Sequence, residues 1–458
     1  MSNSLPNLEA YWMPYTGNRY FKKNPRMFKK ASGMFYTTHT DDQVLDGASG
    51  LWCCNTGHCH PKIVEAVQKQ AETLDYATAF QLGHPTVFEM ADKLVNMAPD
   101  GITHVFFSNS GSEAVDTALK IALAYHRARG EGHRTRLIGR EKGYHGVGFG
   151  GISVGGMSPN RKMFGALLPA VDHLKHTHNL EHNAFSIGQP EWGGHLADEL
   201  SDILALHDPS TVAAVILEPI AGSAGVLIPP VGYLERIREI CDEHGILLIM
   251  DEVITGFRAS PGGIQQKYNI TPDLSTHAKI LAGGFPGGCV TGKSEIMDIL
   301  ELRELDEFWN REQRIAHQGT YNANPVSAAA GSKTLGLIKE GAHTQTADAT
   351  TADLVSQLNK LFEARTLDAS AWHVSSMWHL NLGENSPKST DVENNPDYLP
   401  SGIDKPLLQP LRWALYNHGV DLMADGGMVS SAHGKEEIAL TVEAFDLAIN
   451  DLRDDGYL

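Results

Sequence analysis

The sequence has few cysteines, few positive charges and no long apolar run. Its five cysteines are an odd number among 458 residues and lack the spacing of a disulfide framework, so we expect reduced thiols and a cytoplasmic location. The 37 Lys and Arg are outnumbered by 55 Asp and Glu, and the resulting net charge of -18 argues against binding to nucleic acid or to anionic membrane surfaces. No apolar run reaches the length of a membrane span, and the first ten residues, MSNSLPNLEA, do not resemble a signal peptide.

The cluster of cysteine and histidine residues at 51–61 (LWCCNTGHCHP) lacks the spacing of a metal site. Thiolate and imidazole groups suit zinc, but Cys53 and Cys54 are neighbours and the chain contains no Cys-x-x-Cys pair. Cys241 and Cys289 stand alone far downstream. We therefore predict no metal site.

The same segment indicates ordinary local structure. Leu51 and Trp52 have the character of a strand end, and Gly57 suits a turn. Pro61 suits the first position of a helix.

Glycine-rich nucleotide motifs are also missing. Residues 106–120 (FFSNSGSEAVDTALK) place a Ser/Gly turn between a predicted strand and a predicted helix. Neither the Walker motif nor the dinucleotide Gly-x-Gly-x-x-Gly pattern is present there. This absence disfavours a nicotinamide-dependent dehydrogenase.

Strand-like runs alternate with amphipathic helices from about residue 61 to about residue 325. This alternation predicts an α/β fold whose mostly parallel central sheet is covered on both faces. We predict a large domain over 61–325, an N-terminal arm over 1–60, and a smaller α+β domain over 326–458 that the arm joins. The strand candidates are 103–107, 136–140, 212–219, 245–253 and 287–292.

Two segments lack this alternation. Residues 157–200 are irregular and rich in histidine, without the helical zinc motif, so we expect a polar surface excursion. Residues 384–402 are rich in Asn, Pro, Ser and Asp and predict a long surface loop or lid.

The turn within residues 106–120 has features of a phosphate site. Ser110, Gly111 and Ser112 lie where a strand ends and a helix begins. Backbone N–H groups and the helix dipole favour anions at such a position. A serine that only caps the helix gives the same pattern, so this turn alone is not decisive.

A carboxylate and a lysine each come after a strand-like segment. Asp251 comes directly after the apolar run 247–250, at the kind of strand end where open parallel sheets bind ligands. An idle charge beside such a strand would be costly. Lys279 lies between the strand-like Thr276–Ala278 and Ile280. Burial would lower the pKa of its amine and free the amine for imine chemistry.

Together, these three features match the needs of pyridoxal phosphate. The cofactor requires an imine bond to lysine, an acidic partner for its pyridine nitrogen and an anchor for its phosphate. Tyr144, in GYHG (143–146), would supply an aromatic face to the ring, and Val253 would press on the other side.

In combination, these motifs resemble the class III (omega) aminotransferases of fold type I, over nearly the whole chain. The segments YWMPYTGNR, GLWCCNTGHCHP, SNSGSEA, EKGYHGVGFGG and LEPIAGSAGV are most similar to β-alanine–pyruvate transaminases. From about residue 251, DEVITGFRASPGG, AKILAGGFPGG and GTYNANPVSAAAG are more similar to glutamate-semialdehyde aminomutases.

The resemblance implies a role for each motif. Lys279 would bind the cofactor and shuttle the proton, and Asp251 would pair with the pyridine nitrogen. Thr320 would reach the phosphate of a neighbouring subunit, which implies a homodimer with shared active sites, possibly assembled into a tetramer. The residues expected to bind the cofactor are Ser110, Gly111, Ser112, Tyr144, His145, Glu218, Asp251, Val253, Lys279 and Thr320.

The reaction implied by the resemblance is a ping-pong transfer of an amino group from an ω-amino acid or primary amine to pyruvate or another 2-oxo acid. An intramolecular aminomutase of the glutamate-semialdehyde type is the alternative, and it would need no second keto acid. A cofactor-binding regulatory domain is disfavoured by the acidic charge and the lack of a DNA-binding extension. The resemblance also implies that Trp52 and Tyr144 lie beside the substrate and that Tyr76 and Phe80 line the entrance to the active site.

One feature departs from the family. Many ω-transaminases use an arginine near the C-terminus to bind the acceptor's carboxylate, but no arginine occurs here between Arg412 and Arg453. A carboxylate in a partly dry pocket still needs a cation. Arg258 and Arg19 are the candidates, and we favour Arg258. Structural salt bridges are the alternative role for both residues.

Overall fold

The computed structural model describes residues 6–179, 181–383, 405–423 and 425–458. The loop predicted at 384–402 lies outside these residues. The largest element is a seven-stranded sheet of order β4-β10-β9-β8-β7-β5-β6. β10 is antiparallel to both of its neighbours, and the other pairs are parallel. The strands are β4 (His104–Ser108), β5 (Arg136–Arg140), β6 (Val171–Leu174), β7 (Val212–Leu217), β8 (Leu247–Asp251), β9 (Leu274–Ala278) and β10 (Gly288–Gly292).

Helices cover this sheet on both faces, which explains why strands β7, β8, β9 and β10 are buried at every residue. Successive side chains of a strand point to opposite faces. Leu248 accordingly packs in a core with helices α8 and α9, and Ile249 in a second core with α5 and α11. The helices of this part are α3 (Pro61–Thr73), α4 (Pro85–Met97), α5 (Gly111–Ala128), α6 (Phe149–Val154), α7 (Ser158–Arg161), α8 (Glu199–His207), α9 (Tyr233–His244), α10 (Gly263–Lys267), α11 (Ser294–Met297) and α12 (Pro325–Ile338).

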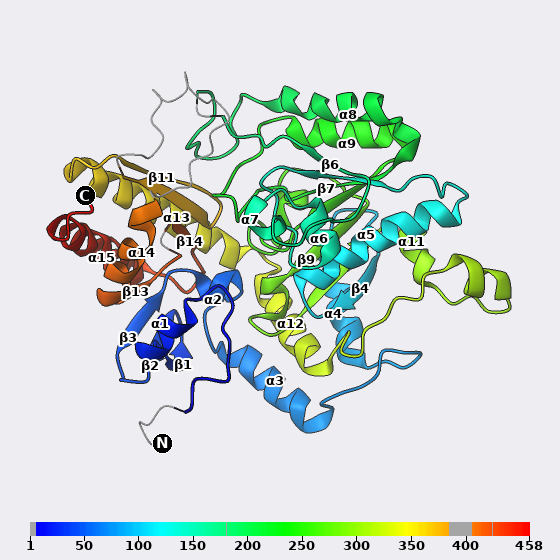
Figure 1. Ribbon diagram of the computed structural model, residues 1–458. Coiled ribbons are helices and arrows are strands. Elements are labelled where there is room, and N and C mark those ends of the chain that lie inside the picture. The colour runs from blue at the N-terminus through cyan, green and yellow to red at the C-terminus, as the bar shows by residue number, and fades with distance from the viewer. Residues whose placement is uncertain (1–5, 180, 384–404, 424) are drawn as a thin grey trace.

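The two ends of the chain meet in a second region. Figure 1 shows the blue N-terminal strands beside the orange and red C-terminal helices, and Leu45 of β3 pairs with Val420 of β13 in parallel. Met34 and Phe445 lie in the same buried cluster. The elements are α1 (Asn18–Lys23), β1 (Phe28–Ser32), β2 (Phe35–Thr38), β3 (Gln43–Asp46), α2 (Ser49–Trp52), α13 (Ala342–Ala364), β11 (Ala369–Val374), β12 (Met377–Leu382), α14 (Lys405–Asn417), β13 (Val420–Asp421), β14 (Gly426–Met428) and α15 (Lys435–Asp454).

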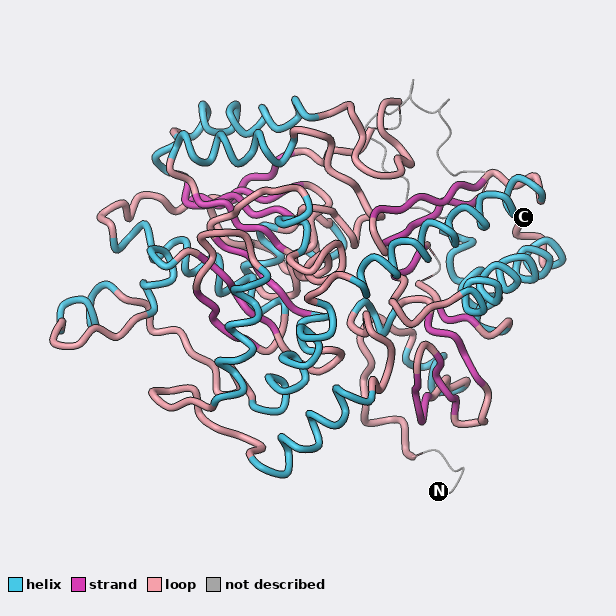
Figure 2. Tube along the Cα trace, turned by 180° about the vertical axis from the view of Figure 1, so that it is seen from behind, coloured by secondary structure: helices cyan, strands magenta, loops and turns pink. Residues whose placement is uncertain are grey.

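From behind, the large sheet and its helices occupy one side of the molecule, and the short sheets lie on the side of the C-terminus (Figure 2). This arrangement confirms the predicted α/β fold, in which a mostly parallel sheet is accompanied by a smaller α+β part. Among the described helices, none combines the length and apolar character that crossing a membrane would require.

Two local predictions are wrong. Leu51 and Trp52 belong to the helical turn α2 rather than to a strand, and both have positive φ values, 56° and 75°. Within the expected surface excursion at 157–200, residues 171–174 form β6, the edge strand beside β5. This strand was missed because its sequence, VDHL, is short and half polar.

Candidate active site

A cavity of about 400 Å³ lies at the carboxyl ends of the central strands, where open α/β sheets bind ligands. Every residue predicted to bind the cofactor lines it, apart from Thr320. These lining residues are Ser110, Gly111, Ser112, Tyr144, His145, Glu218, Asp251, Val253 and Lys279. The fold thus joins turns that follow β4, β5, β7, β8 and β9.

Asp251 is a buried carboxylate held in a fixed orientation. Its Oδ2 lies 2.7 Å from Nδ1 of His145. Its Oδ1 accepts hydrogen bonds from Thr276 Oγ1 at 3.0 Å and from the backbone N–H of Val253 at 3.1 Å. Because each oxygen is engaged, the carboxylate cannot rotate without losing hydrogen bonds.

Lys279 begins the turn that follows β9, and its positive φ of 52° sets it apart from the extended strand. Burial lowers the pKa of its amine below the ordinary value of 10.5, and the nearby Asp251 opposes this shift. The Nζ atom lies 5.3 Å from the centre of the Trp52 ring. A desolvated lysine with a lowered pKa is suited to act as a nucleophile and as a base.

Glu218 is buried beside these groups. Its Oε1 accepts a 2.7 Å hydrogen bond from the backbone N–H of Tyr144. Its Oε2 and the Nε2 atom of His145 are buried without a hydrogen-bond partner among the described residues. Burial raises the pKa of Glu218 to about 7. Unpartnered polar atoms in a cavity wall indicate that the site is built to receive a polar ligand.

The turn at the start of α5 is shaped for close approach of an anion. Ser110 caps the helix, since its Oγ accepts the N–H of Glu113 at 3.2 Å. The first N–H groups of a helix, here those of Gly111 and Ser112, have no acceptor within the helix. A Cβ atom added to Gly111 would lie 2.9 Å from Cγ1 of Val253, so a larger residue would close this cradle.

These residues fit pyridoxal phosphate. The helix start offers N–H groups for a phosphate, and Tyr144 and Val253 flank the cavity in which a planar ring would lie. Asp251 would supply the negative charge that a protonated pyridine nitrogen requires, and Lys279 would supply the amine.

The structure does not bring four predicted residues into the cavity of this chain. Thr320 is exposed, and its carbonyl oxygen accepts a 3.0 Å hydrogen bond from the hydroxyl of Tyr76. Tyr76 and Phe80 are 41% and 46% exposed. Arg19 is exposed on α1. None of the four lines the cavity, and neither does Trp52, although its ring lies 5.3 Å from the Nζ atom of Lys279.

Arg258 is also absent from the cavity wall. It is fully buried, and its guanidinium joins three segments that are distant in sequence. Nη2 donates to the carbonyl of Trp52 at 3.1 Å, and Nη1 donates to the carbonyl of Val429 and to Ser376 Oγ, each at 3.3 Å. Burial lowers its pKa to about 10. In the described part of the chain its side chain therefore ties the Trp52 turn to the small sheet, with no ion pair at 4.0 Å or less.

Replacing Arg258 by methionine should lower the free energy of unfolding by about 2–4 kcal/mol, because buried acceptors lose a charged donor. Urea denaturation measures this loss, and Arg19→Met is the exposed control. If Arg258 only holds Trp52, the KM values of amine and keto acid should change together. A selective rise in the keto-acid KM would instead support carboxylate binding by Arg258. Unchanged unfolding would contradict the structural account.

The raised pKa of Glu218 predicts a pH-dependent stability. In the folded state the carboxyl group of Glu218 keeps its proton up to about pH 7, whereas the ordinary pKa of a glutamate is 4.5. The contribution of Glu218 to the free energy of unfolding is therefore complete below about pH 4.5 and is lost as pH rises through about 7. Relative to Glu218→Gln, the cofactor-free wild type should lose on the order of 3 kcal/mol between pH 4.5 and 8. Urea unfolding of both proteins at several pH values tests this. Parallel profiles would show that the proton is not retained.

Sequence reasoning missed several lining residues. Cys53 lines the cavity, although the spacing of the cysteines in this segment predicted no metal site. Its position beside Trp52 was the available signal. Phe285 and Pro286, from the glycine-rich bend after Lys279, also line it. Among the described residues no group of three or more His, Cys, Asp or Glu side chains is arranged to hold a metal ion.

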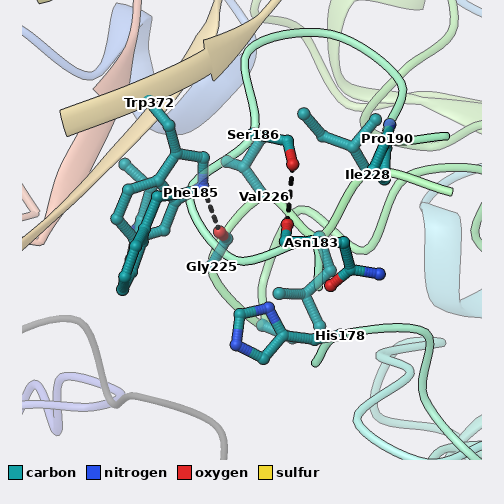
Figure 3. A pocket seen from close by; sticks show the side chains of 12 residues that line it. His178, Asn183, Phe185, Ser186, Pro190, Gly225, Val226, Ile228 and Trp372 are labelled. Carbon is teal, nitrogen blue, oxygen red and sulfur yellow. Dashed lines mark hydrogen bonds between the residues drawn. The ribbon is translucent and has the colours of Figure 1, made fainter. Parts of the chain in front are cut away.

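A much smaller cavity, of about 20 Å³, lies where the 157–200 segment meets the small sheet (Figure 3). It has room for roughly one water molecule. The indole N–H of Trp372 donates to the carbonyl of Gly225 at 3.2 Å, and Phe185 packs on the same indole at 5.0 Å between ring centres. We interpret this cavity as a packing junction between the two parts of the chain.

Comparison with known proteins agrees with this geometry. Residues 17–369 match the family described as aminotransferase class-III. An omega-aminotransferase from Caulobacter vibrioides is 56% identical over 336 residues, which cover 73% of this chain and 75% of that protein. A beta-alanine–pyruvate aminotransferase from Pseudomonas aeruginosa is 48% identical over 336 residues, covering 72% and 74%.

A solved structure extends the similarity to nearly the whole chain. The crystal structure of an amine transaminase from an uncultivated Pseudomonas species, in its pyridoxal-phosphate-bound form, has a TM-score of 0.84 at 29% identity and covers 98% of this chain and 100% of that one. The relatives named here are all aminotransferases, so the aminomutase alternative receives no support. The chain belongs to the class III aminotransferases, enzymes that depend on pyridoxal phosphate.

Proposed function

We propose that this enzyme transfers an amino group from an ω-amino acid or a primary amine to pyruvate or another 2-oxo acid, by a ping-pong mechanism. The observation that carries the proposal is the buried Lys279 amine facing the same cavity as Asp251 and Glu218. Relatives named as omega-aminotransferase and beta-alanine–pyruvate aminotransferase support this choice of substrates.

The chain's own residues would divide the work. Gly111 and Ser112 would bind the cofactor phosphate through backbone N–H groups, and Asp251 would hold the pyridine nitrogen protonated. The protonated ring, when bound, supplies an electron sink for the bond broken at the substrate carbon. Lys279 would attach the cofactor and would move the substrate's proton as a general base and then a general acid. The Trp52 ring, beside the Lys279 amine, would form one side of the substrate pocket and exclude water from it.

Half-reactions of the holoenzyme test the proposal. Adding β-alanine or a primary amine alone should convert the cofactor's absorption spectrum to that of its amine form, and adding pyruvate should restore the first spectrum. A panel of amines and 2-oxo acids would rank the substrates. Failure of every amine to change the spectrum would refute the proposed donor class.

The assembly we propose is a homodimer with shared sites. Support comes from Thr320, Tyr76 and Phe80, which are predicted active-site residues but lie exposed outside their own chain's cavity. A neighbouring copy would use them to complete its site. The division into an arm (1–60), a large domain (61–325) and a small domain (326–458) is proposed with it; α12, at the start of the last range, packs against α3 and α4 of the large domain. The cytoplasmic location and any further assembly into a tetramer remain predictions from the sequence.

Thr320→Ala should weaken cofactor binding about 10- to 100-fold if its hydroxyl reaches the phosphate held by a partner, since a hydrogen bond to a charged group contributes about 1.5–3 kcal/mol. Equilibrium dialysis of the cofactor measures this. Thr346→Ala, an exposed change on α13, is the matched control. Equal cofactor affinity in both variants would remove the reason for placing Thr320 at a partner's site.

A further inference from the structure

A second large cavity, of about 630 Å³, lies beside the edge strand β6. Its volume falls in the range of about 300–1,000 Å³ that is typical of sites for small molecules. The segments that follow β5 and β6 form much of its wall, so it lies at the carboxyl ends of two parallel strands. The lining residues are Glu141, Lys142, Gly156, Arg161, His173, Lys175, His176, His178, Asn179, Trp192 and Leu196.

The residues that line this cavity, called the groove below, carry a net positive charge, opposite in sign to the net charge of the whole chain. The protein has a net charge of -18, yet Lys142, Arg161 and Lys175 line the groove together with a single carboxylate, Glu141. Within the described residues, no ion pair at 4.0 Å or less involves any of these three cations. A nearby carboxylate, Glu199, accepts the backbone N–H of Lys175 at 2.7 Å. Like charges that line one cavity repel one another, and an anion bound between them would relieve that repulsion.

The backbone holds this arrangement in place. Lys142 has a positive φ of 64°, and its N–H donates to the carbonyl of Gly156 at 3.2 Å. Gly156 packs so closely that an added Cβ atom would lie 2.4 Å from the carbonyl oxygen of Arg140. The N–H of Glu141 donates to the carbonyl of Leu174, which fixes the loop to the end of β6.

Arg161, His178 and Trp192 also line the groove. Arg161 Nη1 donates to the carbonyl of Gly155 at 2.8 Å and lies 3.0 Å from Nε2 of His173, so Nε and Nη2 would be left for a ligand. Nε2 of His178 is buried without a hydrogen-bond partner among the described residues. The Trp192 ring stacks on His182 at 4.5 Å between ring centres and offers an apolar wall.

We propose that this groove is a second ligand site, separate from the catalytic cavity, that binds a small phosphate monoester. Lys142, Lys175 and Arg161 would contact the phosphate, because its double negative charge matches their excess charge and guanidinium binds phosphate with good geometry. The organic part of the ligand would lie against Trp192. This proposal does not depend on the amine and keto-acid substrates of the enzyme.

Calorimetric titration of the holoenzyme with phenyl phosphate tests the proposal. We expect saturable binding without any change in the cofactor's absorption spectrum. The double variant Lys142→Glu and Lys175→Glu should weaken binding at least tenfold. Trp192→Ala should weaken phenyl phosphate more than inorganic phosphate, since only the former has a ring.

A control variant makes the same change of charge at two lysines outside the groove. Lys360→Glu with Lys435→Glu alters two exposed lysines, and neither lines this groove. This variant should bind phenyl phosphate as the wild type does. The proposal is overturned if the control loses as much affinity as the groove variant, if the groove variant binds normally, or if binding perturbs the cofactor spectrum and so takes place in the catalytic cavity.

Discussion

Replacing Lys279 by alanine is expected to lower kcat by at least about 10⁴-fold, because in the proposed mechanism one side chain serves both as the nucleophile for the cofactor and as the proton carrier. The variant should still bind pyridoxal phosphate, since Asp251 and the turn that begins α5 are untouched. Steady-state kinetics gives the loss of activity, and gel filtration followed by absorption spectroscopy gives the retained cofactor.

Borohydride reduction supplies the control for this variant. In the wild type, reduction should fix the cofactor to the peptide that carries Lys279, whereas in Lys279→Ala no peptide should be labelled. Lys339→Ala, which changes an exposed lysine after α12, should keep both the label and the activity. A label on any other lysine of the wild type would show that the assignment is wrong.

Replacing Asp251 is expected to have the second largest effect. Asp251→Asn keeps the shape of the side chain but removes its charge, so the pyridine nitrogen would lose the partner that keeps it protonated. We expect kcat to fall about 10²–10³-fold, the range seen when one preorganised electrostatic contact is removed. Cofactor affinity should fall less, by about 1.5–3 kcal/mol, because phosphate and ring contacts persist.

A neighbouring variant separates charge from hydrogen bonding. Thr276→Val removes one donor to Asp251 Oδ1 but leaves the carboxylate in place. It should therefore lower kcat much less than Asp251→Asn does. Near-normal turnover in Asp251→Asn would remove the reason for placing this carboxylate under the ring.

Much of the fold could be predicted because its signals are local. The apolar run before Asp251 indicates a strand covered on both faces, and β8 is buried at every residue. The Ser/Gly turn before Val115 indicates a helix start, and α5 begins at Gly111. The strand β6 escaped prediction because a short edge strand is defined by its neighbour β5 more than by its own residues.

The site could be predicted only in part, for a related reason. Asp251 ends an apolar strand and Lys279 follows a strand-like segment, so their sequence positions indicate that they meet at one sheet edge, whereas Glu218 is expected only from the family resemblance. The surroundings of Arg258 depend on Ser376 and Val429, which lie more than a hundred residues away, and no local pattern reports such contacts. Cys53 faces the cavity because the turn at Leu51 and Trp52 adopts positive φ values that the sequence does not signal.

The central claim is that an amino group moves between two molecules, and an isotope measurement tests it most directly. Holoenzyme is incubated with ¹⁵N-labelled β-alanine, or a labelled primary amine, and unlabelled pyruvate, and the products are analysed by mass spectrometry. We predict that ¹⁵N appears in alanine, with one alanine formed for each amine consumed and none without pyruvate. Label that stays on the donor's carbon skeleton, or turnover of a single substrate in the absence of any keto acid, would contradict the account.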